Sequence, residues 1–469
     1  MQIPVLSGIY TDGGLDIRVA LPRNLVPVSL DSGISTGYLR PADGIVQMAE
    51  GPGIDRGGIN WLGKCYRVMG TSFVSVLDTG DVTVIGDVGG DRNSCVTMDY
   101  SFDRLAIASG GNLYLYDGTT LSVVSDPDAG TVLDVVWIDG YFLITDGEFV
   151  AQTELTDPSA INPLKYGSAE ADPDSIVALL RLRNEVYALN RYTIEVLENQ
   201  GGSGFAFSRI ESAQIQRGAV GTHACCVYFD AIAFVGSGRN EPVGVYLGAN
   251  GSSEKISSLE VDLVLSQYSE ASLGELKIEA RNDRGQWHLY VHLDDRTLVY
   301  DRAMSEQAGG PVWFALSSGV GGAQSKYRAR NMVWCYDLWI VGDPSGPNIG
   351  ALDHRVGSHW GQVVGWEFGT RVIYAEGKGA VVGEIEMVSL PGRQALGEAS
   401  SVSTSYSVDG VTWSQDRTVS SGLQGDRARR FVWRRQGKMR HWRVQRFRGD
   451  SRNRIPVIRI EAAMEALAY

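Results

Sequence analysis

Basic residues with few acidic neighbours crowd one segment near the C-terminus. Residues 427–454 hold 12 Lys and Arg against a single acid, Asp450. The rest of the chain has 30 basic and 54 acidic residues. The segment therefore has a formal net charge of +11, whereas the remainder of the chain has a formal net charge of −24. Guanidinium groups bind carboxylates and phosphates because their planar donors match both anions. The six cations that we expect to act together at an assembly interface are Arg434, Arg435, Lys438, Arg440, Arg443 and Arg446.

Three interpretations of this basic segment differ in what the cations would face. They could meet an acidic protein surface, lie on a solvated strand face, or contact nucleic acid with help from nearby aromatic residues. Phe431 alternates with Trp433, and Trp442 alternates with Val444. This alternation predicts paired strands with one apolar face and one arginine-rich face. We favour the protein interface because Arg is enriched there, and the other two interpretations stay open.

Motifs for catalysis and cofactor binding are missing from the sequence. Gly377-Lys378 is followed by Gly379 rather than by Ser or Thr, and the chain has no GxGxxG or GxSxG motif. His288 and His292 are four residues apart on a predicted strand, but two histidines are too few ligands for a metal site. We therefore expect no enzyme activity, no catalytic residues, no cofactor and no metal.

One short motif keeps a carbohydrate-related alternative open. Residues 407–413, SVDGVTW, resemble the Asp-box turn of sialidases and other propellers, with a spacing one residue shorter. The alternative function is thus a β-propeller carbohydrate-binding adhesin or glycosidase. The simpler prediction is a hairpin in which Asp409-Gly410 makes the turn and Trp413 packs beneath it.

The elements that must carry these residues are predicted to be short strands. Gly accounts for 57 of 469 residues and apolar residues for 43%, which together favour many tight turns in a globular chain. Asp117-Gly118 between two alternating runs is typical of a hairpin. Similar units recur with a spacing near 45 residues, the size of a four-stranded propeller blade. Their markers are Tyr66, Leu105, Trp137, Val186, Phe229, His288 and Val333.

These patterns predict an all-β protein, a β-propeller of six or seven blades with an additional C-terminal antiparallel β-sandwich-like domain. The expected domains are an N-terminal arm with entry strands (1–50), the propeller (51–360) and the C-terminal domain with its arginine-rich hairpin (361–469). Only Ser257–Ser269 and Glu461–Leu467 have a helical pattern, so helix should stay below about 12%. The blade boundaries within 90–210 are not defined by the sequence.

The ends, the charge and the cysteines point to an intracellular origin. Residues 1–10 lack a basic region and a long apolar run, so we expect no secretory signal, and no apolar stretch is long enough to span a membrane. The net charge of −13 disfavours general nucleic-acid coating. Five cysteines are too few and odd in number for a disulfide scaffold, so we expect buried reduced thiols.

The order of several segments resembles the packaged-DNA stabilisation proteins of short-tailed bacteriophages, the tail accessory or nozzle family. The segments are STGYLRPADGI (35–45), RGG (56–58), YRVMG (66–70), IQRGAVGTHACCVYFDAIAFVG (215–236), GSSEKISS (251–258), WHLYVHLDDRTLVYD (287–301), PVWFALSSG (311–319), DGVTWS (409–414) and FVWRRQGKMR (431–440). Their order and the arginine-rich hairpin carry the resemblance, and residues 90–210 match poorly.

This resemblance implies a structural protein of the virion tail, not an enzyme. It implies a homo-oligomer, a hexameric ring, that extends the DNA channel below the portal and its head-to-tail adaptor and retains packaged DNA. The further partners that it implies are a tailspike or tail fibre and a tail needle or plug. Genomic DNA would pass through the lumen without sequence-specific binding. An acidic lumen wall would allow this passage, because a basic wall would hold the DNA phosphates. We expect assembly in the host cytoplasm and no membrane insertion.

Overall fold

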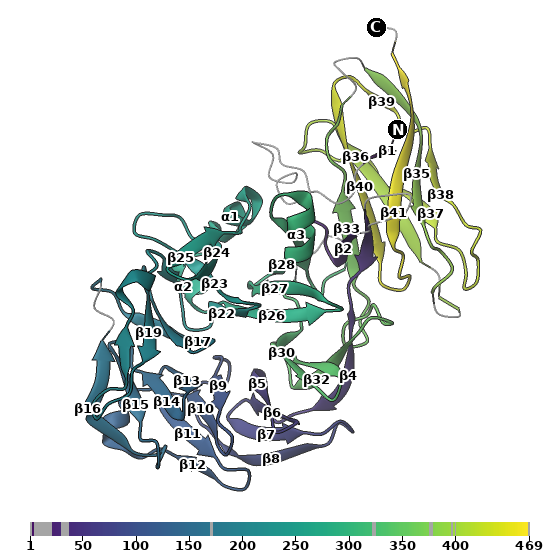
Figure 1. The fold of residues 1–469 in the computed structure, drawn as a ribbon. Helices are drawn as coiled ribbons and strands as arrows, with labels where there is room; N and C mark the ends of the chain where they lie inside the picture. Colours follow the sequence, from purple (N-terminus) through teal and green to yellow (C-terminus); the bar gives the residue numbers. More distant parts are fainter. Residues whose placement is uncertain are drawn as a thin grey trace. The chain divides into compact units, whose positions relative to one another are not determined.

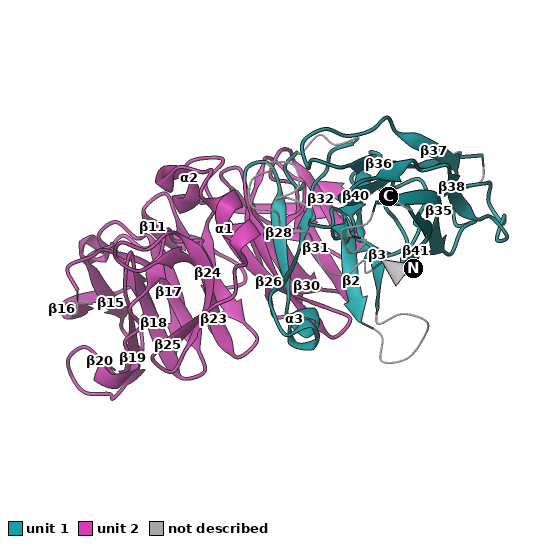
Figure 2. Ribbon diagram, turned by 90° about the horizontal axis from the view of Figure 1, so that it is seen from above, with its two compact units in different colours: residues 1–46, 294–327, 353–469 teal, residues 47–293, 328–352 magenta. Residues whose placement is uncertain are grey.

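The computed structural model describes residues 2–3, 21–29, 37–168, 172–320, 325–374, 379–394, 397–398 and 400–467. The structure is 53% strand and 6% helix, which confirms the all-β prediction. Two compact units divide the chain: unit 1 has residues 1–46, 294–327 and 353–469, and unit 2 has residues 47–293 and 328–352 (Figure 2). The domain boundaries expected at residues 50 and 360 stay predictions. Half of the expected N-terminal arm, residues 1, 4–20 and 30–36, lies outside the described residues.

Unit 2 consists of short antiparallel strands joined by tight turns. The strands of its five complete sheets are β5 (Asp55–Trp61), β6 (Lys64–Met69), β7 (Ser72–Val76) and β8 (Val82–Asp87); β9 (Thr97–Tyr100), β10 (Leu105–Ser109), β11 (Asn112–Tyr116) and β12 (Leu121–Val123); β13 (Asp134–Ile138), β14 (Tyr141–Thr145), β15 (Phe149–Thr153) and β16 (Ile161–Ser168); β17 (Ile176–Leu182), β18 (Glu185–Asn190), β19 (Ile194–Asn199) and β20 (Phe207–Arg209); and β21 (Gly218–Ala219), β22 (Cys225–Tyr228), β23 (Ala231–Ser237), β24 (Gly244–Ala249) and β25 (Ser252–Lys255). Two further groups are β26 (Lys277–Asp283) with β27 (Gln286–His292), and β30 (Arg330–Cys335) with β31 (Leu338–Gly342) and β32 (Asn348–Asp353). The helices α1 (Leu259–Leu265) and α2 (Glu270–Gly274) follow β25, and α1 confirms the helix expected within 257–269.

Seven inner strands close into a ring. Contacts run from β5 to β9, β13, β17, β22, β26 and β30, and β30 contacts β5 again (Figure 1). Radial closure protects strand edges that would otherwise expose unpaired backbone groups. The predicted propeller is confirmed, and its inner ring has seven members, the larger of the two blade numbers expected.

The inner strands are also joined by carboxylates that accept backbone amides from the next strand of the ring. The bonds are Asp99 Oδ2 to Trp137 N at 2.7 Å, Asp134 Oδ2 to Leu179 N at 2.7 Å, and Glu279 Oε2 to Met332 N at 2.8 Å. These bonds satisfy amides on the inner strands that have no ladder partner. Burial raises the pKa of the Asp134 carboxyl to about 7, although the amides of Leu179 and Val135 oppose this.

The local turn chemistry follows the sequence prediction. Asp117 Oδ1 accepts the amides of Thr119 and Thr120 at 2.8 and 2.7 Å, and Gly118 has φ of 93°. Glycine tolerates this left-handed conformation without steric cost. The predicted hairpin between β11 and β12 is confirmed.

Unit 1 contains a two-sheet sandwich. One sheet has the order β2 (Leu25–Ser29), β3 (Gly37–Pro41), β41 (Val457–Ala466), β35 (Ala380–Ser389) and β38 (Phe431–Arg434), with β1 (Gln2–Ile3) beside β41 and β39 (Lys438–Met439) beside β35. The other has the order β33 (Gly365–Gly369), β40 (Trp442–Asp450), β36 (Ser401–Ser407) and β37 (Arg417–Ser420), with β34 (Ile373–Tyr374) beside β40. The remaining elements of this unit are β28 (Thr297–Asp301), α3 (Arg302–Ala308) and β29 (Val312–Leu316), and β4 (Gly44–Glu50) contains the passage to unit 2.

The core of the sandwich is aromatic and draws on both sheets. Phe431 and Trp433 of one sheet pack with Trp366, Phe368 and Phe447 of the other. The ring centroids of Phe368 and Phe447 are 5.1 Å apart, and those of Trp433 and Phe447 are 5.5 Å apart. Such pairs add a specific geometry to the burial of large apolar surfaces. The predicted C-terminal β-sandwich is confirmed.

Two smaller expectations need correction. Residues 461–466 belong to strand β41 and pair with β35, so the predicted C-terminal helix is wrong. Tertiary pairing has overridden the helical propensity of the Ala- and Glu-rich tail. All five cysteines carry free thiols, but Cys95 and Cys226 are only partly buried.

Candidate assembly surface on the C-terminal sandwich

The predicted cluster of six cations lies on β38, β39, β40 and the turns between them, but the structure separates its members. Arg434 ends β38, Lys438 begins β39, and Arg443 and Arg446 lie within β40. Arg435 has φ of 56° and donates its amide to Gly383 O at 2.6 Å, which turns the chain away from β38. The six residues therefore lie on three strands and the turns between them, and not on one face of a single hairpin.

Arg443 is a correction to the predicted cluster. It is 0% exposed, its Nε and Nη2 donate to Gln445 Oε1 at 3.0 and 2.7 Å, and its Nη1 donates to Gln436 O at 2.7 Å. Its guanidinium also lies 3.9 Å from the centre of the Tyr406 ring. Burial lowers the pKa of Arg443 to about 10. A side chain held inside the sandwich has no surface to offer a partner, so Arg443 is structural.

Arg443 was predicted at the surface because the wrong face of β40 was expected to be buried. Residues 443, 445 and 447 point to one side of the strand, and Phe447 lies in the core. Trp442 and Val444 therefore face outward, where Trp413 covers them. The predicted alternation is present, but the apolar face on β40 is the outer one. The predicted pairing of the two strands as an arginine-rich hairpin is wrong, because β38 pairs with β35 in one sheet and β40 pairs with β33 and β36 in the other.

Arg434 and Arg446 are exposed or half-buried, yet each already has an interaction within the chain. Arg434 Nε lies 3.1 Å from Glu384 Oε2 on the neighbouring strand β35. Arg446 stacks over the Trp413 ring at 4.0 Å and lies 3.3 Å from Ser405 Oγ. Neighbouring arginines follow the same rule, since Arg430 pairs with Glu386 at 2.5 Å. In-chain acids thus neutralise part of the basic segment.

Three of the six cations remain exposed, and within the described parts of the chain no acid pairs with them. They are Arg435, Lys438 and Arg440. Arg417 joins them, because its Nη1 donates to the carbonyls of Arg434 and Arg435 at 2.9 and 2.6 Å. We call Arg417, Arg435, Lys438 and Arg440 the basic tip. Sequence reasoning missed Arg417 because it lies outside the basic segment and reaches it only through the β37–β38 contact.

The Asp-box-like segment builds a turn. Asp409 Oδ1 accepts the amides of Val411 and Thr412 at 2.9 and 2.8 Å and also bonds Ser407 Oγ at 2.9 Å. The hydrogen bond from the Thr412 hydroxyl, followed by those from the two amides, holds the pKa of the Asp409 carboxyl well below its usual range. Gly410 has φ of 80°. The predicted hairpin turn is confirmed, and the carboxylate is occupied by its own loop.

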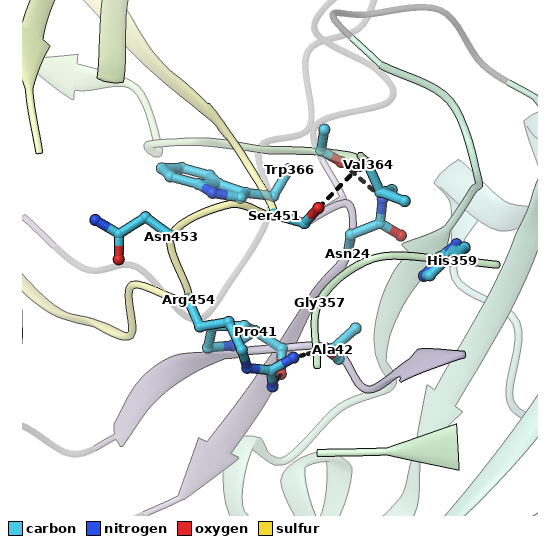
Figure 3. Close-up of a pocket in the computed structure, with 11 residues that line it drawn as sticks. Asn24, Pro41, Ala42, Gly357, His359, Val364, Trp366, Ser451, Asn453 and Arg454 are labelled. Atoms are coloured by element: carbon cyan, nitrogen blue, oxygen red, sulfur yellow. Dashed lines mark hydrogen bonds between the residues drawn. The ribbon is translucent and has the colours of Figure 1, made fainter. Parts of the chain in front are cut away.

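A small pocket within unit 1 contains polar groups but no carboxylate among its lining residues (Figure 3). It encloses about 20 Å³, which is room for a water molecule. Arg454 donates to Pro41 O at 3.2 Å and Ala42 O at 3.0 Å, and Ser451 Oγ accepts the Val364 amide at 2.9 Å. These side chains tie β3 and the loops around residues 356 and 451 together, so Arg454 also serves the fold.

The described residues contain neither a metal-binding cluster nor a membrane-spanning helix. No group of three or more His, Cys, Asp or Glu side chains there could hold a metal ion. His292, one of the two predicted strand histidines, bonds Glu279 Oε1 at 2.7 Å. Among the described helices, none has the length and apolar character to cross a membrane.

Comparison with protein families gives two matches in series. A family model described as bacteriophage P22 Gp10, beta-propeller, matches residues 1–357. A second, described as bacteriophage P22 Gp10, beta-sandwich, matches residues 365–465. No curated protein matches the chain by sequence.

Three solved structures show a distant likeness to the chain. PorZ, a surface component of the type-IX secretion system of Porphyromonas gingivalis, is 11% identical with a TM-score of 0.42, over 66% of this chain and 38% of PorZ. The N-terminal domain of Nup159 is 7% identical with a TM-score of 0.41, over 72% of this chain and 100% of that domain. The designed protein Ika8 is 12% identical with a TM-score of 0.38, over 75% of this chain and 100% of Ika8. At these values the likenesses carry no functional argument.

Proposed function

The chain belongs to the bacteriophage P22 Gp10 family, and from this premise we propose that it is the tail nozzle of a short-tailed phage. The family membership makes it a structural component of the virion that stabilises packaged DNA. The observation that carries the proposal is the pair of family matches in series, which together cover the propeller and the sandwich. The finer features below are proposals.

As a nozzle, the protein forms a homo-oligomeric ring, a hexamer, below the head-to-tail adaptor in the virion tail. Its lumen passes genomic DNA without reading sequence, a needle or plug closes it, and its outer surface receives a tailspike or tail fibre. It works without catalysis and assembles in the host cytoplasm. The net charge of −13 supports passage of DNA, because an acidic wall does not hold phosphates by counterion release.

The basic tip is the part of this proposal that the sandwich geometry supports best. Its cations are exposed and lack acidic partners in the described chain, while the rest of the chain is strongly acidic. An acidic surface on a neighbouring subunit or on the adaptor would remove their mutual repulsion and steer docking. We therefore assign the basic tip to ring or adaptor assembly.

Reversal of three tip charges tests this assignment. The variant Arg435→Glu/Lys438→Glu/Arg440→Glu should fold normally, because exposed substitutions usually change stability by less than about 0.5 kcal/mol. It should fail to form the ring or to join the adaptor, measured by size-exclusion chromatography at low and high salt. A matched control, Lys64→Glu/Arg92→Glu/Arg183→Glu, makes the same charge change at exposed cations of unit 2 and should assemble.

Two results would count against the assignment. Normal assembly of the tip variant would remove its role at an interface. Normal assembly together with poorer retention of DNA in filled heads would show that the basic tip faces DNA.

A further inference from the structure

Unit 2 exposes apolar side chains at one end of four neighbouring blades, which begin with the inner strands β30, β5, β9 and β13. Successive strands of a blade are antiparallel, so the connection between its first two strands and the connection between its last two lie at the same end. The exposed apolar residues at this end are Leu62, Leu77, Phe102, Leu155, Trp334 and Leu338. We call these six residues the apolar arc.

Hydrogen bonds hold the blades together beneath the apolar arc. Asn60 Nδ2 donates to Trp334 O at 2.8 Å, and Trp61 Nε1 donates to Ser101 O at 3.0 Å. These bonds join the ends of β30, β5 and β9. The residues beside them in the chain belong to the apolar arc, so its members on these three blades are neighbours in space.

The apolar arc extends onto the next blade and is strongly exposed. The centre of the Phe102 ring lies 5.8 Å from that of Trp137, and Leu155 lies against Gly140 of the same blade. Phe102 is 86% exposed and Leu62 is 71% exposed. Single exposed apolar residues are ordinary, but a continuous exposed group on four blades is typical of a surface that is covered in an assembly.

The same end of these four blades is acidic. The connections that form it are residues 62–63, 77–81, 101–104, 117–120, 139–140, 154–160 and 336–337. Together they contain eight acids and one base, Arg104. Among the acids, hydrogen bonds from Thr120 and Thr119 lower the pKa of the Asp117 carboxyl to about 2, so it is ionised at neutral pH. A partner that fits this surface should therefore combine apolar contacts with positive charge.

The end of the sandwich that contains the basic tip has both properties. Its four cations have no acidic partner in the described chain, and one of them, Arg417, directly follows the connection 408–416. That connection exposes Val408 and Val411. Apolar side chains and cations are thus presented by adjoining segments of one surface.

We propose that the apolar arc of one copy of the chain binds the basic tip of a second copy. Val408 and Val411 would pack on the apolar arc, while the cations of the tip would pair with the carboxylates of the surrounding connections. Because the two surfaces differ, each copy offers one of each, and such head-to-tail contacts close into a ring when the rotation between copies allows it. This inference rests on the proposed nozzle ring and names the contact between its subunits.

Complementation between two full-length variants tests the contact. The arc variant Leu62→Asn/Phe102→Ser keeps the basic tip, and the tip variant Arg435→Glu/Lys438→Glu/Arg440→Glu keeps the apolar arc. Asn suits position 62, where φ is 51°. Each variant alone should lose the ring, because removal of a central interface side chain weakens a contact about thirtyfold. Mixed together, the two should form a heterodimer that grows no further, measured by sedimentation velocity at low and high salt.

The matched control, Val84→Ser/Leu164→Ser, removes exposed apolar side chains from the outer strands β8 and β16 and should assemble like the wild-type protein. Thermal unfolding followed by circular dichroism checks that each variant folds. If the arc variant does not fold, Leu155→Ser/Leu338→Ser removes two other members of the apolar arc.

Two outcomes would overturn the inference while the nozzle proposal stands. In one, the wild-type protein forms the ring and a folded arc variant forms it equally well. In the other, the wild-type protein forms the ring but the mixed variants stay monomeric. A wild-type chain that forms no ring, either alone or on the adaptor, would overturn the nozzle proposal as well.

Discussion

Arg67 in unit 2 and Arg443 in the sandwich are both fully buried, yet the two regions neutralise them in different ways. Arg67 forms an ion pair with Asp55 at 2.5 Å, and Arg443 bonds only an amide and a carbonyl oxygen. Burial opposes the charge of Arg67, but Asp55 outweighs it and leaves the pKa of Arg67 above its usual value. With no such acid, burial lowers the pKa of Arg443 to about 10.

This difference shows what each arginine contributes. Removing Arg67 would strand a buried carboxylate, which is among the costliest single changes in a protein. Removing Arg443 would strand neutral acceptors, which cost less. The propeller therefore pairs its buried Arg67 with a carboxylate on the inner strand β5, whereas the sandwich holds its buried Arg443 with neutral acceptors.

The largest effect is expected from Arg67→Met. Asp55 would lose its cation at a site with 0% exposure, so the free energy of unfolding should fall by about 3–5 kcal/mol. Urea denaturation measures this loss. The double variant Arg67→Met/Asp55→Asn should recover part of it, because no unpaired charge then remains. The ion-pair account would be contradicted if the unfolding free energy of the double variant fell by the sum of the losses in the two single variants.

A smaller effect is expected from Arg443→Met. Gln445 Oε1 and Gln436 O would lose their donors, so the unfolding free energy should fall by about 1–3 kcal/mol. The change Arg443→Glu should be worse, because it would place a carboxylate against two acceptors, and the sandwich should fail to fold. Denaturation of the purified variants checks both. Wild-type stability in Arg443→Glu would mean that the side chain is not inside the sandwich.

The smallest effect is expected from Arg434→Gln. Its side chain is 76% exposed beside Glu384, and exposed ion pairs are worth less than about 1 kcal/mol. Denaturation at low and high salt should give nearly the same curve as the wild-type protein. A loss of unfolding free energy as large as that of Arg443→Met would show that side-chain exposure does not explain the different contributions of Arg434 and Arg443 to stability.

Much of the local structure was determined by the sequence itself. Alternating runs and Asp-Gly turns predicted the hairpins, and the spacing near 45 residues predicted the propeller. Phe431 and Trp433 were placed correctly on the apolar face of β38. These features depend on residues close in the chain, where turn geometry and the two-residue period of strands decide the outcome.

The tertiary structure decided the features that depend on distant partners. Alternation on β40 is visible in the sequence, but only the opposite sheet determines which face is buried, so Arg443 was assigned to the wrong side. The same holds for the tail, which pairs with β35 as a strand despite its helical composition. Within the described parts of the chain, only Arg435, Lys438 and Arg440 of the six predicted cations are exposed without an acidic partner. Arg443 is buried, and Arg434 and Arg446 contact Glu384 and the Trp413 ring, which come from segments distant in the chain. Charge and periodicity are properties of neighbouring residues, whereas burial and ion pairing require both partners in space.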